Sequence, residues 1–226
     1  MKRILSGLSR FQNEIFPQTR QLFERLASSQ APEALFLTCS DSRIVPELIT
    51  QTAPGDLFTC RNAGNIVPAY GEENSGVSAT IEFAVLALGV KDIIICGHSD
   101  CGAMSGLLHP EQLAGMPNVA AWLKHAESAR FIVQDNYPHL KGAELLNALI
   151  EENVVAQLAN LGTHPSVASR LRKGKLQLHG WVYQIDDGTV TAFDPGLARF
   201  VLIGKTAGES EDGFTRGAAV EGANVE

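Results

Sequence analysis

The stretch CGHSDCGAM (96–104) places a histidine and a cysteine three positions apart, His98 and Cys101, directly after an apolar run. A further cysteine, Cys39, opens the segment CSDSR after another apolar run. Two thiolates and one imidazole form a ligand set that selects Zn²⁺ over Mg²⁺ or Ca²⁺. Three protein ligands would leave a fourth position open, as in a catalytic zinc site. Taken alone, His-x-x-Cys is a weak signal, because a buried, hydrogen-bonded histidine is more common than a ligand.

Two other residues of CSDSR, Asp41 and Arg43, alternate with Cys39 and can share one face of an extended segment. Asp41 could supply a fourth zinc ligand, or it could pair with Arg43 through a bidentate contact and leave zinc open to water. One aspartate cannot do both at once, so the pair is a candidate gate. The segment also resembles a phosphate-binding cysteine loop, but its Cys-to-Arg spacing is too short to present enough backbone amides.

These motifs need elements that position them, and the best candidates are three short apolar runs at 34–39, 56–60 and 92–96. A polar loop follows each run, and the loop after the second run is RNAGN (61–65). The Ala-rich segment 76–90 is typical of a crossover helix between parallel strands. This pattern predicts an α/β fold with a mainly parallel central sheet flanked by helices. Because the site of such a sheet lies at the carboxyl ends of its strands, we expect Cys39, His98 and Cys101 to converge.

The remaining sequence predicts helices on both sides of this unit. Residues 1–29 have apolar residues at helical spacing and indicate an N-terminal helical arm, and further helices are expected over 117–135, 141–162 and 163–174. Segments 176–185 and 189–193 flank Asp187-Gly188, which indicates a C-terminal β-hairpin. From Gly204 the chain is rich in glycine and acidic residues, so we expect a single domain over 1–203 and a flexible tail over 204–226.

Composition excludes several partners. The net charge is −7, and lysine and arginine are scattered, so no basic stripe indicates a nucleic-acid partner. No apolar stretch has the length of a secretory or membrane-spanning segment, which predicts a cytoplasmic protein without a membrane partner. In that reducing compartment, metal binding or catalysis explains the cysteines better than disulfides do. Cys60 and Cys96 end strand-like runs and are expected to pack as small core residues.

Together, CSDSR and GHSDCGA resemble the β-class carbonic anhydrases. The likeness extends over residues 1 to about 203 and includes GDLFTCRNAGNIVPAYG (55–71), SATIEFAV (78–85), ENVVAQLANL (152–161) and LHGWVY (178–183). The bacterial and cyanobacterial branch, with its cyanate-operon and carboxysomal enzymes, is the most similar. The resemblance implies reversible hydration of carbon dioxide to bicarbonate and a proton, by attack of zinc-bound hydroxide on CO2.

Carried over residue by residue, the family pattern makes Cys39, His98 and Cys101 the zinc ligands. It makes Asp41 and Arg43 the catalytic dyad, with Asp41 on zinc only in a closed state. The implied substrate-binding residues are Gln30, Phe58, Phe83 and Gly102, and Ala63 is expected to add a wall to the pocket because CO2 is small and apolar. Some members also build a regulatory bicarbonate site from Trp, Arg and Tyr, and the matching positions are Phe36, Arg61 and Tyr183. Phe36 has no indole N–H to donate, which argues against that site.

The resemblance also implies a homodimer or higher oligomer, in which the N-terminal arm clasps a neighbour and Gln30 reaches across the interface. A location within a carboxysome, with a scaffold protein as partner, is a further expectation, and supply of CO2 or bicarbonate to cyanate metabolism is another. Two rival functions stay open. One is a hydrolase of carbon disulfide or carbonyl sulfide with the same ligands. The other is a zinc-stabilised scaffold without activity, which the presence of both Asp41 and Arg43 disfavours.

Overall fold

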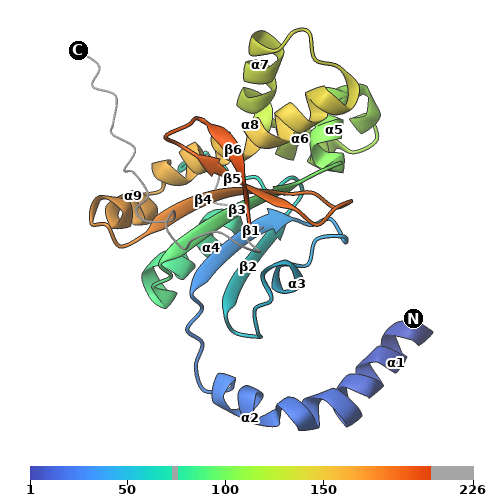
Figure 1. The fold of residues 1–226 in the computed structure, drawn as a ribbon, viewed down its shortest axis with the longest axis vertical. Coiled ribbons are helices and arrows are strands. Elements are labelled where there is room, and N and C mark those ends of the chain that lie inside the picture. Colours follow the sequence, from blue (N-terminus) through green and yellow to red (C-terminus); the bar gives the residue numbers. More distant parts are fainter. Residues whose placement is uncertain (73–75, 205–226) are drawn as a thin grey trace.

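A computed structural model of the chain describes residues 1–72 and 76–204 (Figure 1). Its centre is a six-stranded sheet with the order β2-β1-β3-β4-β5-β6. The strands are β1 (Ala34–Cys39), β2 (Leu57–Asn62), β3 (Asp92–His98), β4 (Gln177–Tyr183), β5 (Val190–Asp194) and β6 (Arg199–Ile203). The first four are parallel, and the last two are antiparallel to their neighbours. The predicted α/β fold with a mainly parallel sheet is confirmed. The expected tail lies outside the described residues beyond Gly204.

Helices connect the strands and flank the sheet. They are α1 (Lys2–Arg10), η1 (Phe11–Ile15), α2 (Phe16–Leu26), α3 (Pro46–Thr50), α4 (Gly76–Glu82), η2 (Phe83–Leu88), α5 (Gly102–Leu108), η3 (Pro110–Leu113), α6 (Pro117–Leu123), η4 (Lys124–Ala126), α7 (Glu127–Asn136), α8 (Gly142–Thr163) and α9 (Pro165–Arg172). The predicted crossover helix corresponds to α4 and η2. Within the described residues, no helix is long and apolar enough to cross a membrane.

Successive strand residues point to opposite sides of the sheet, so each strand contributes side chains to both faces. The two faces are covered by different groups of residues. Leu37 and Ile95 belong to the main hydrophobic core, together with residues of α8 such as Val154. On the opposite face, a smaller buried cluster contains Phe36 and Cys96 and consists of strand residues only. Cys96 is therefore a core residue, as expected. The strands that end at the candidate site are therefore held in place by packing against α8.

The N-terminal arm is one helical run through α1, η1 and α2, and it lies apart from the sheet (Figure 1). None of its residues is buried. Its exposed apolar side chains are Ile4, Leu5, Leu8, Phe11 and Ile15. The predicted helical arm is thus present, and its apolar residues have no cover from the chain's own core.

The C-terminal strands differ from the prediction in one respect. The hairpin of β4 and β5 is present, but β6 continues it into a three-stranded antiparallel extension of the parallel sheet. A tight turn joins β5 to β6, in which Asp194 Oδ1 accepts hydrogen bonds from the amides of Gly196 and Leu197. The rings of Phe193 and Phe200 then pack across the two strands, with 5.5 Å between centroids.

Candidate functional site

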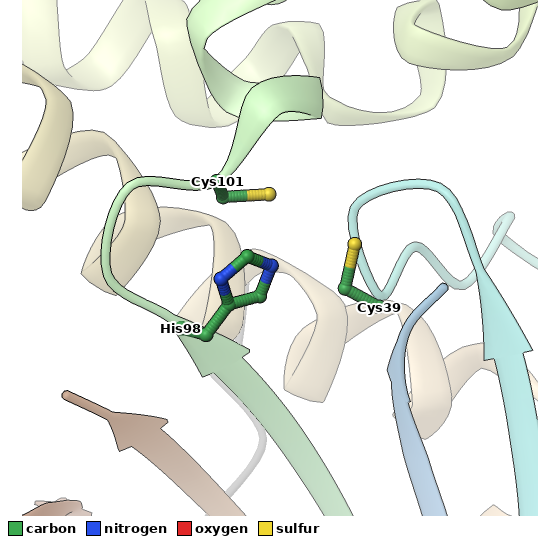
Figure 2. Close-up of side chains that lie close together, drawn as sticks. All are labelled: Cys39, His98 and Cys101. Carbon is green, nitrogen blue, oxygen red and sulfur yellow. The ribbon is translucent and has the colours of Figure 1, made fainter. Parts of the chain in front are cut away.

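The candidate site lies at the carboxyl ends of β1 and β3. Cys39 is the last residue of β1 and His98 the last residue of β3, and these strands are neighbours. Cys101 follows a turn in which Asp100 has a positive φ of 55°, and it caps the start of α5. One ligand atom from each of Cys39, His98 and Cys101 lies within 4.8 Å of the others, and all three residues are buried. Figure 2 shows the two sulfur atoms and the imidazole ring around a common space.

The imidazole of His98 is oriented for a metal. Its Nδ1 lies 2.9 Å from the backbone oxygen of Ser99 and donates its proton there. This contact fixes the tautomer and leaves a lone pair on Nε2. Nε2 is buried and has no hydrogen-bond partner among the described residues. A buried nitrogen without a partner carries a desolvation cost, and a metal ion between the three side chains would remove it.

The two thiols also fit a cation. Cys39 and Cys101 are both free. The hydrogen bond from Cys101 lowers the pKa of Cys39 to about 4, although burial opposes that change. Contact with Cys39 raises the pKa of Cys101, and burial adds to the effect. One thiol of the pair therefore ionises readily and the other does not, unless a cation stabilises both as thiolates.

Asp41 borders this group of ligands and is held by Arg43. Arg43 Nε lies 3.0 Å from Asp41 Oδ1, and Arg43 Nη2 lies 2.8 Å from Asp41 Oδ2. These hydrogen bonds hold the pKa of the Asp41 carboxyl below its usual range. Asp41 Oδ2 is 3.9 Å from His98 Nε2. Of the two arrangements that the sequence allows, the structure therefore contains the one in which Asp41 pairs with Arg43.

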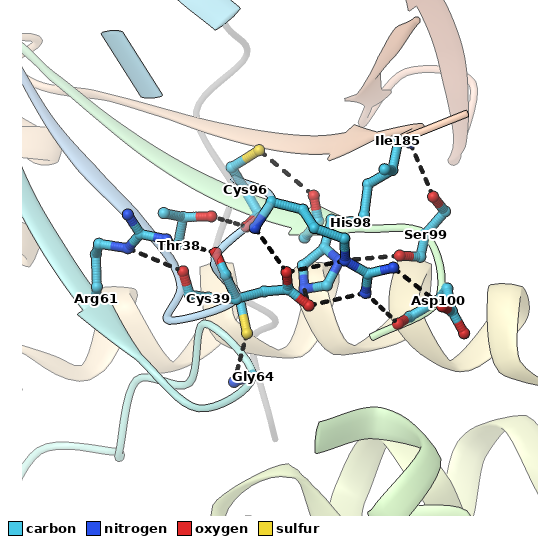
Figure 3. A network of polar contacts seen from close by, with 12 residues as sticks. Thr38, Cys39, Arg61, Gly64, Cys96, His98, Ser99, Asp100 and Ile185 are labelled. Atoms are coloured by element: carbon cyan, nitrogen blue, oxygen red, sulfur yellow. Dashed lines mark hydrogen bonds and ion pairs between the residues drawn. The ribbon is translucent and has the colours of Figure 1, made fainter. Parts of the chain in front are cut away.

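Two further residues support this arrangement without having been assigned to it from the sequence. Asp100 binds Arg43 from the other side, since its carboxylate and its backbone oxygen each lie 3.1 Å from a guanidinium nitrogen. Arg61 donates to the backbone oxygens of Cys39 and Asp41, at 3.1 and 2.7 Å (Figure 3). The loop that carries Cys39 and Asp41 is thus fixed from β2 as well.

The residues predicted to bind substrate lie on several separate elements, and Phe58 pairs with Leu35 on β1, four residues before Cys39. The rings of Phe58 and Phe83 pack with 5.9 Å between centroids. The backbone oxygen of Ala63 accepts a hydrogen bond from Trp122 Nε1. Gly102 is exposed and begins α5. Gln30 is exposed and lies between α2 and β1.

The residues at the regulatory positions lie on three strands of the sheet. Phe36 is fully buried, and its ring lies 6.0 Å from that of Trp181. Tyr183 packs against the same small cluster. Arg61, in contrast, already uses its Nε and Nη2 on backbone oxygens. A bicarbonate ion at these positions would compete with the backbone oxygens of Cys39 and Asp41 for the N–H groups of Arg61.

Comparisons with known proteins agree with this geometry. The carbonic anhydrase family profile matches residues 34–190. A carbonic anhydrase of Pseudomonas aeruginosa is 54% identical over 203 residues, which cover 90% of this chain and 92% of the relative. One from Synechocystis is 50% identical over 89% of this chain and 74% of the relative. The solved β-carbonic anhydrase CcaA superposes with a TM-score of 0.87 at 50% identity, covering 89% of this chain and 98% of that one. The chain therefore belongs to the carbonic anhydrase family and, within it, to the β class.

Proposed function

We propose that this carbonic anhydrase binds one zinc ion through Cys39, His98 and Cys101 and interconverts carbon dioxide and bicarbonate there. The observation that carries the proposal is the approach of two thiols and one imidazole to within 4.8 Å in a buried space. This donor set favours zinc over hard cations such as Mg²⁺. Zinc, when bound, supplies the Lewis acidity that makes water a good nucleophile near neutral pH.

Asp41 and Arg43 are proposed to control the fourth position. Arg43 engages both carboxylate oxygens of Asp41 and keeps that carboxylate turned toward the guanidinium. Because Arg43 also keeps Asp41 ionised, the carboxylate can only accept hydrogen bonds, and it can orient a donor that enters the site. If the contact with Arg43 is lost, Asp41 is free to become a fourth ligand and close the site.

The proposed substrate pocket combines apolar walls with a few polar groups, as small-molecule sites usually do. Phe58, Phe83 and Ala63 suit carbon dioxide, which is small and apolar. The backbone N–H of Gly102 and the side-chain amide of Gln30 are proposed to bind bicarbonate. Since Gln30 is exposed outside the sheet in a single chain, its role requires a contact across a subunit interface.

We therefore also propose that the active protein is a homodimer or a larger oligomer. The exposed apolar residues of the N-terminal arm support this, because a second chain would remove them from water. A solved structure from Sordaria macrospora, with a TM-score of 0.74 and 29% identity, belongs to a study of two tetrameric β-carbonic anhydrases. A cytoplasmic or carboxysomal location, binding of a carboxysome scaffold protein and a role in cyanate metabolism stay predictions.

Stopped-flow CO2 hydration with a pH indicator, combined with zinc analysis, tests the proposed function. The unsubstituted protein should carry about one zinc per chain and hydrate CO2 rapidly. Cys101→Ser should lose both properties. Cys60→Ser is the matched control, because it makes the same substitution at a cysteine outside the ligand group, and it should keep both. Slow hydration by zinc-loaded, unsubstituted protein would contradict the proposal.

A further inference from the structure

The loop 63–67, which follows β2, is held by side chains of helices that contain none of the proposed zinc ligands. On α8, Asn153, Gln157 and Asn160 recur at positions i, i+4 and i+7 and therefore share one face. Asn153 and Gln157 are 1% and 0% exposed. Amides at this depth need hydrogen-bond partners, because an unpaired buried polar group is costly. Their partners are each other and this loop.

The hydrogen bonds run along the loop in order. Asn153 Nδ2 donates to the backbone oxygen of Gly64 at 3.0 Å, and Gln157 Nε2 donates to Asn153 Oδ1 at 2.9 Å. Gln157 Oε1 accepts from the amide of Val67 at 2.9 Å, and Asn160 Nδ2 donates to the oxygen of Val67 at 2.9 Å. Gln157 thereby fixes the orientation of the Asn153 amide, and Asn153 fixes Gly64.

The peptide bond between Ala63 and Gly64 connects this loop to the proposed metal centre. Its oxygen accepts a hydrogen bond from Trp122 Nε1 at 2.8 Å. Its N–H points the other way and donates to Sγ of Cys39 at 3.4 Å (Figure 3). A hydrogen bond to the oxygen of a peptide polarises its N–H and makes it a better donor. One peptide group thus links Trp122 of α6 to Cys39.

The backbone conformation and packing at position 64 strongly favour glycine. Its φ is +82°, which L side chains rarely adopt. A Cβ at Gly64 would also lie 2.9 Å from Cε of Met104 and 3.1 Å from Cβ of Ala103. The backbone is therefore packed closely against α5, which begins directly after Cys101. This close approach keeps the N–H of Gly64 directed at Cys39.

We propose that Trp122 and Asn153 are positioning residues of the metal centre, which hold Gly64 with its N–H on the thiolate of Cys39. This inference rests on the proposed function, since it assumes a metal on Cys39. A hydrogen bond to a thiolate withdraws electron density from sulfur. It therefore offsets part of the strong donation from two thiolate ligands and keeps the bound metal more Lewis-acidic. Groups that orient metal ligands in this way typically contribute 10- to 100-fold to metal affinity.

The test uses the full-length protein loaded with Co²⁺ and follows its thiolate-to-metal charge-transfer absorption. Trp122→Phe keeps an aromatic ring but removes the N–H that binds Ala63. Trp181→Phe is the matched control, because it makes the same change on the opposite face of the sheet. With a weaker hydrogen bond, the sulfur of Cys39 is more electron-rich, so the band of Trp122→Phe should move to longer wavelength. Its Co²⁺ and Zn²⁺ affinities should fall by about 10-fold or more.

A second pair of variants covers the case in which Trp122→Phe does not fold. Asn153→Leu removes the donor to Gly64, and Asn160→Leu removes a comparable hydrogen bond to Val67 that does not involve Gly64. Both variants lose an amide of α8 that binds this loop, so a general loosening of the loop would appear in both. The inference requires the band shift and the loss of affinity in Asn153→Leu only.

The possible outcomes separate this inference from the proposed function. Equal bands and equal affinities in Trp122→Phe and Trp181→Phe, or in the two α8 variants, would overturn the positioning role alone. Absence of any thiolate-to-metal band in the unsubstituted protein would overturn the metal site itself, and the inference with it.

Discussion

Arg43 engages both carboxylate oxygens of Asp41, with 3.0 Å between Nε and Oδ1 and 2.8 Å between Nη2 and Oδ2. On its other side, the same guanidinium binds the carboxylate of Asp100 at 3.1 Å. Asp41 lies two residues after Cys39, and Asp100 directly precedes Cys101. Arg43 therefore ties together the two segments that carry the proposed thiolate ligands, and it holds Asp41 away from the metal position at the same time.

Replacing Arg43 by lysine should lower kcat/KM for CO2 hydration by about 10-fold or more. Lysine keeps the positive charge but cannot form the bidentate contact with Asp41. Asp41 would then spend more time as a fourth ligand, and the closed form would be populated. Zinc content should stay the same because no proposed ligand changes. The exposed Arg172 on α9 provides the control Arg172→Lys, and a rate for Arg43→Lys equal to that of this control would refute the gating role.

Replacing Gly64 by alanine should lower the free energy of unfolding by about 1–3 kcal/mol. The positive φ and the contacts with Met104 and Ala103 both oppose a Cβ at this position. Urea denaturation of the zinc-loaded protein measures the change. Gly162→Ala in α8 is a suitable control, because a Cβ there meets nothing within 4 Å. This control should be neutral or stabilising, and the idea fails if the two variants are equally stable.

Charges in the N-terminal arm should dissociate the oligomer. Leu8 and Phe11 are 51% and 40% exposed in the single chain, so Leu8→Glu with Phe11→Glu should not disturb its own core. Both chains of a homodimer carry both changes, so loss of four buried apolar side chains of about 1.5 kcal/mol each would raise the dissociation constant by about 10,000-fold. Sedimentation equilibrium measures this change. Phe131→Glu on α7 is the control, since Phe131 is 69% exposed and lies outside the arm. A monomeric unsubstituted protein would disprove the proposal.

Removal of the metal should lower the thermal stability. A chelator would leave His98 Nε2 without a partner among the described residues, and it would remove the cation that stabilises both thiols as thiolates. A metal present at about 1,000 times its dissociation constant contributes about 4 kcal/mol, which corresponds to roughly 10 °C in Tm for a chain of this size. Differential scanning calorimetry with and without the chelator measures the shift. Cys101→Ser should show a low Tm with and without the chelator. If the unsubstituted protein has a similar Tm in both conditions, it does not bind a stabilising metal ion.

The convergence of Cys39, His98 and Cys101 could be predicted because it depends on local patterns. Cys39 and His98 close apolar runs that form neighbouring parallel strands, and Cys101 lies three positions after His98. The carboxyl ends of such strands must meet at one edge of the sheet. The short strand β6 could not be predicted in the same way. Its five residues, Arg199–Ile203, show no regular alternation, and they become a strand through pairing with β5.

The groups that support the site could not be predicted from local patterns, because their partners lie far away in the sequence. Asn153 binds a residue 89 positions away, and Trp122 binds one 59 positions away. No local sequence pattern predicts a hydrogen bond between residues so far apart. One signal was present nevertheless, since Asn153, Gln157 and Asn160 recur at helical spacing and so lie on a single face of the helix. Polar residues on a face that must pack against a sheet indicate a buried hydrogen-bond network.

X-ray absorption at the zinc edge of the purified protein tests most directly whether Cys39 and Cys101 are both zinc ligands, as we propose. We expect about two sulfur atoms at about 2.3 Å, with nitrogen or oxygen at about 2.0–2.1 Å completing the coordination. Cys101→Ser should reduce any remaining signal to about one sulfur per zinc. Zinc bound to the unsubstituted protein without sulfur, or with only one sulfur atom, would contradict the account.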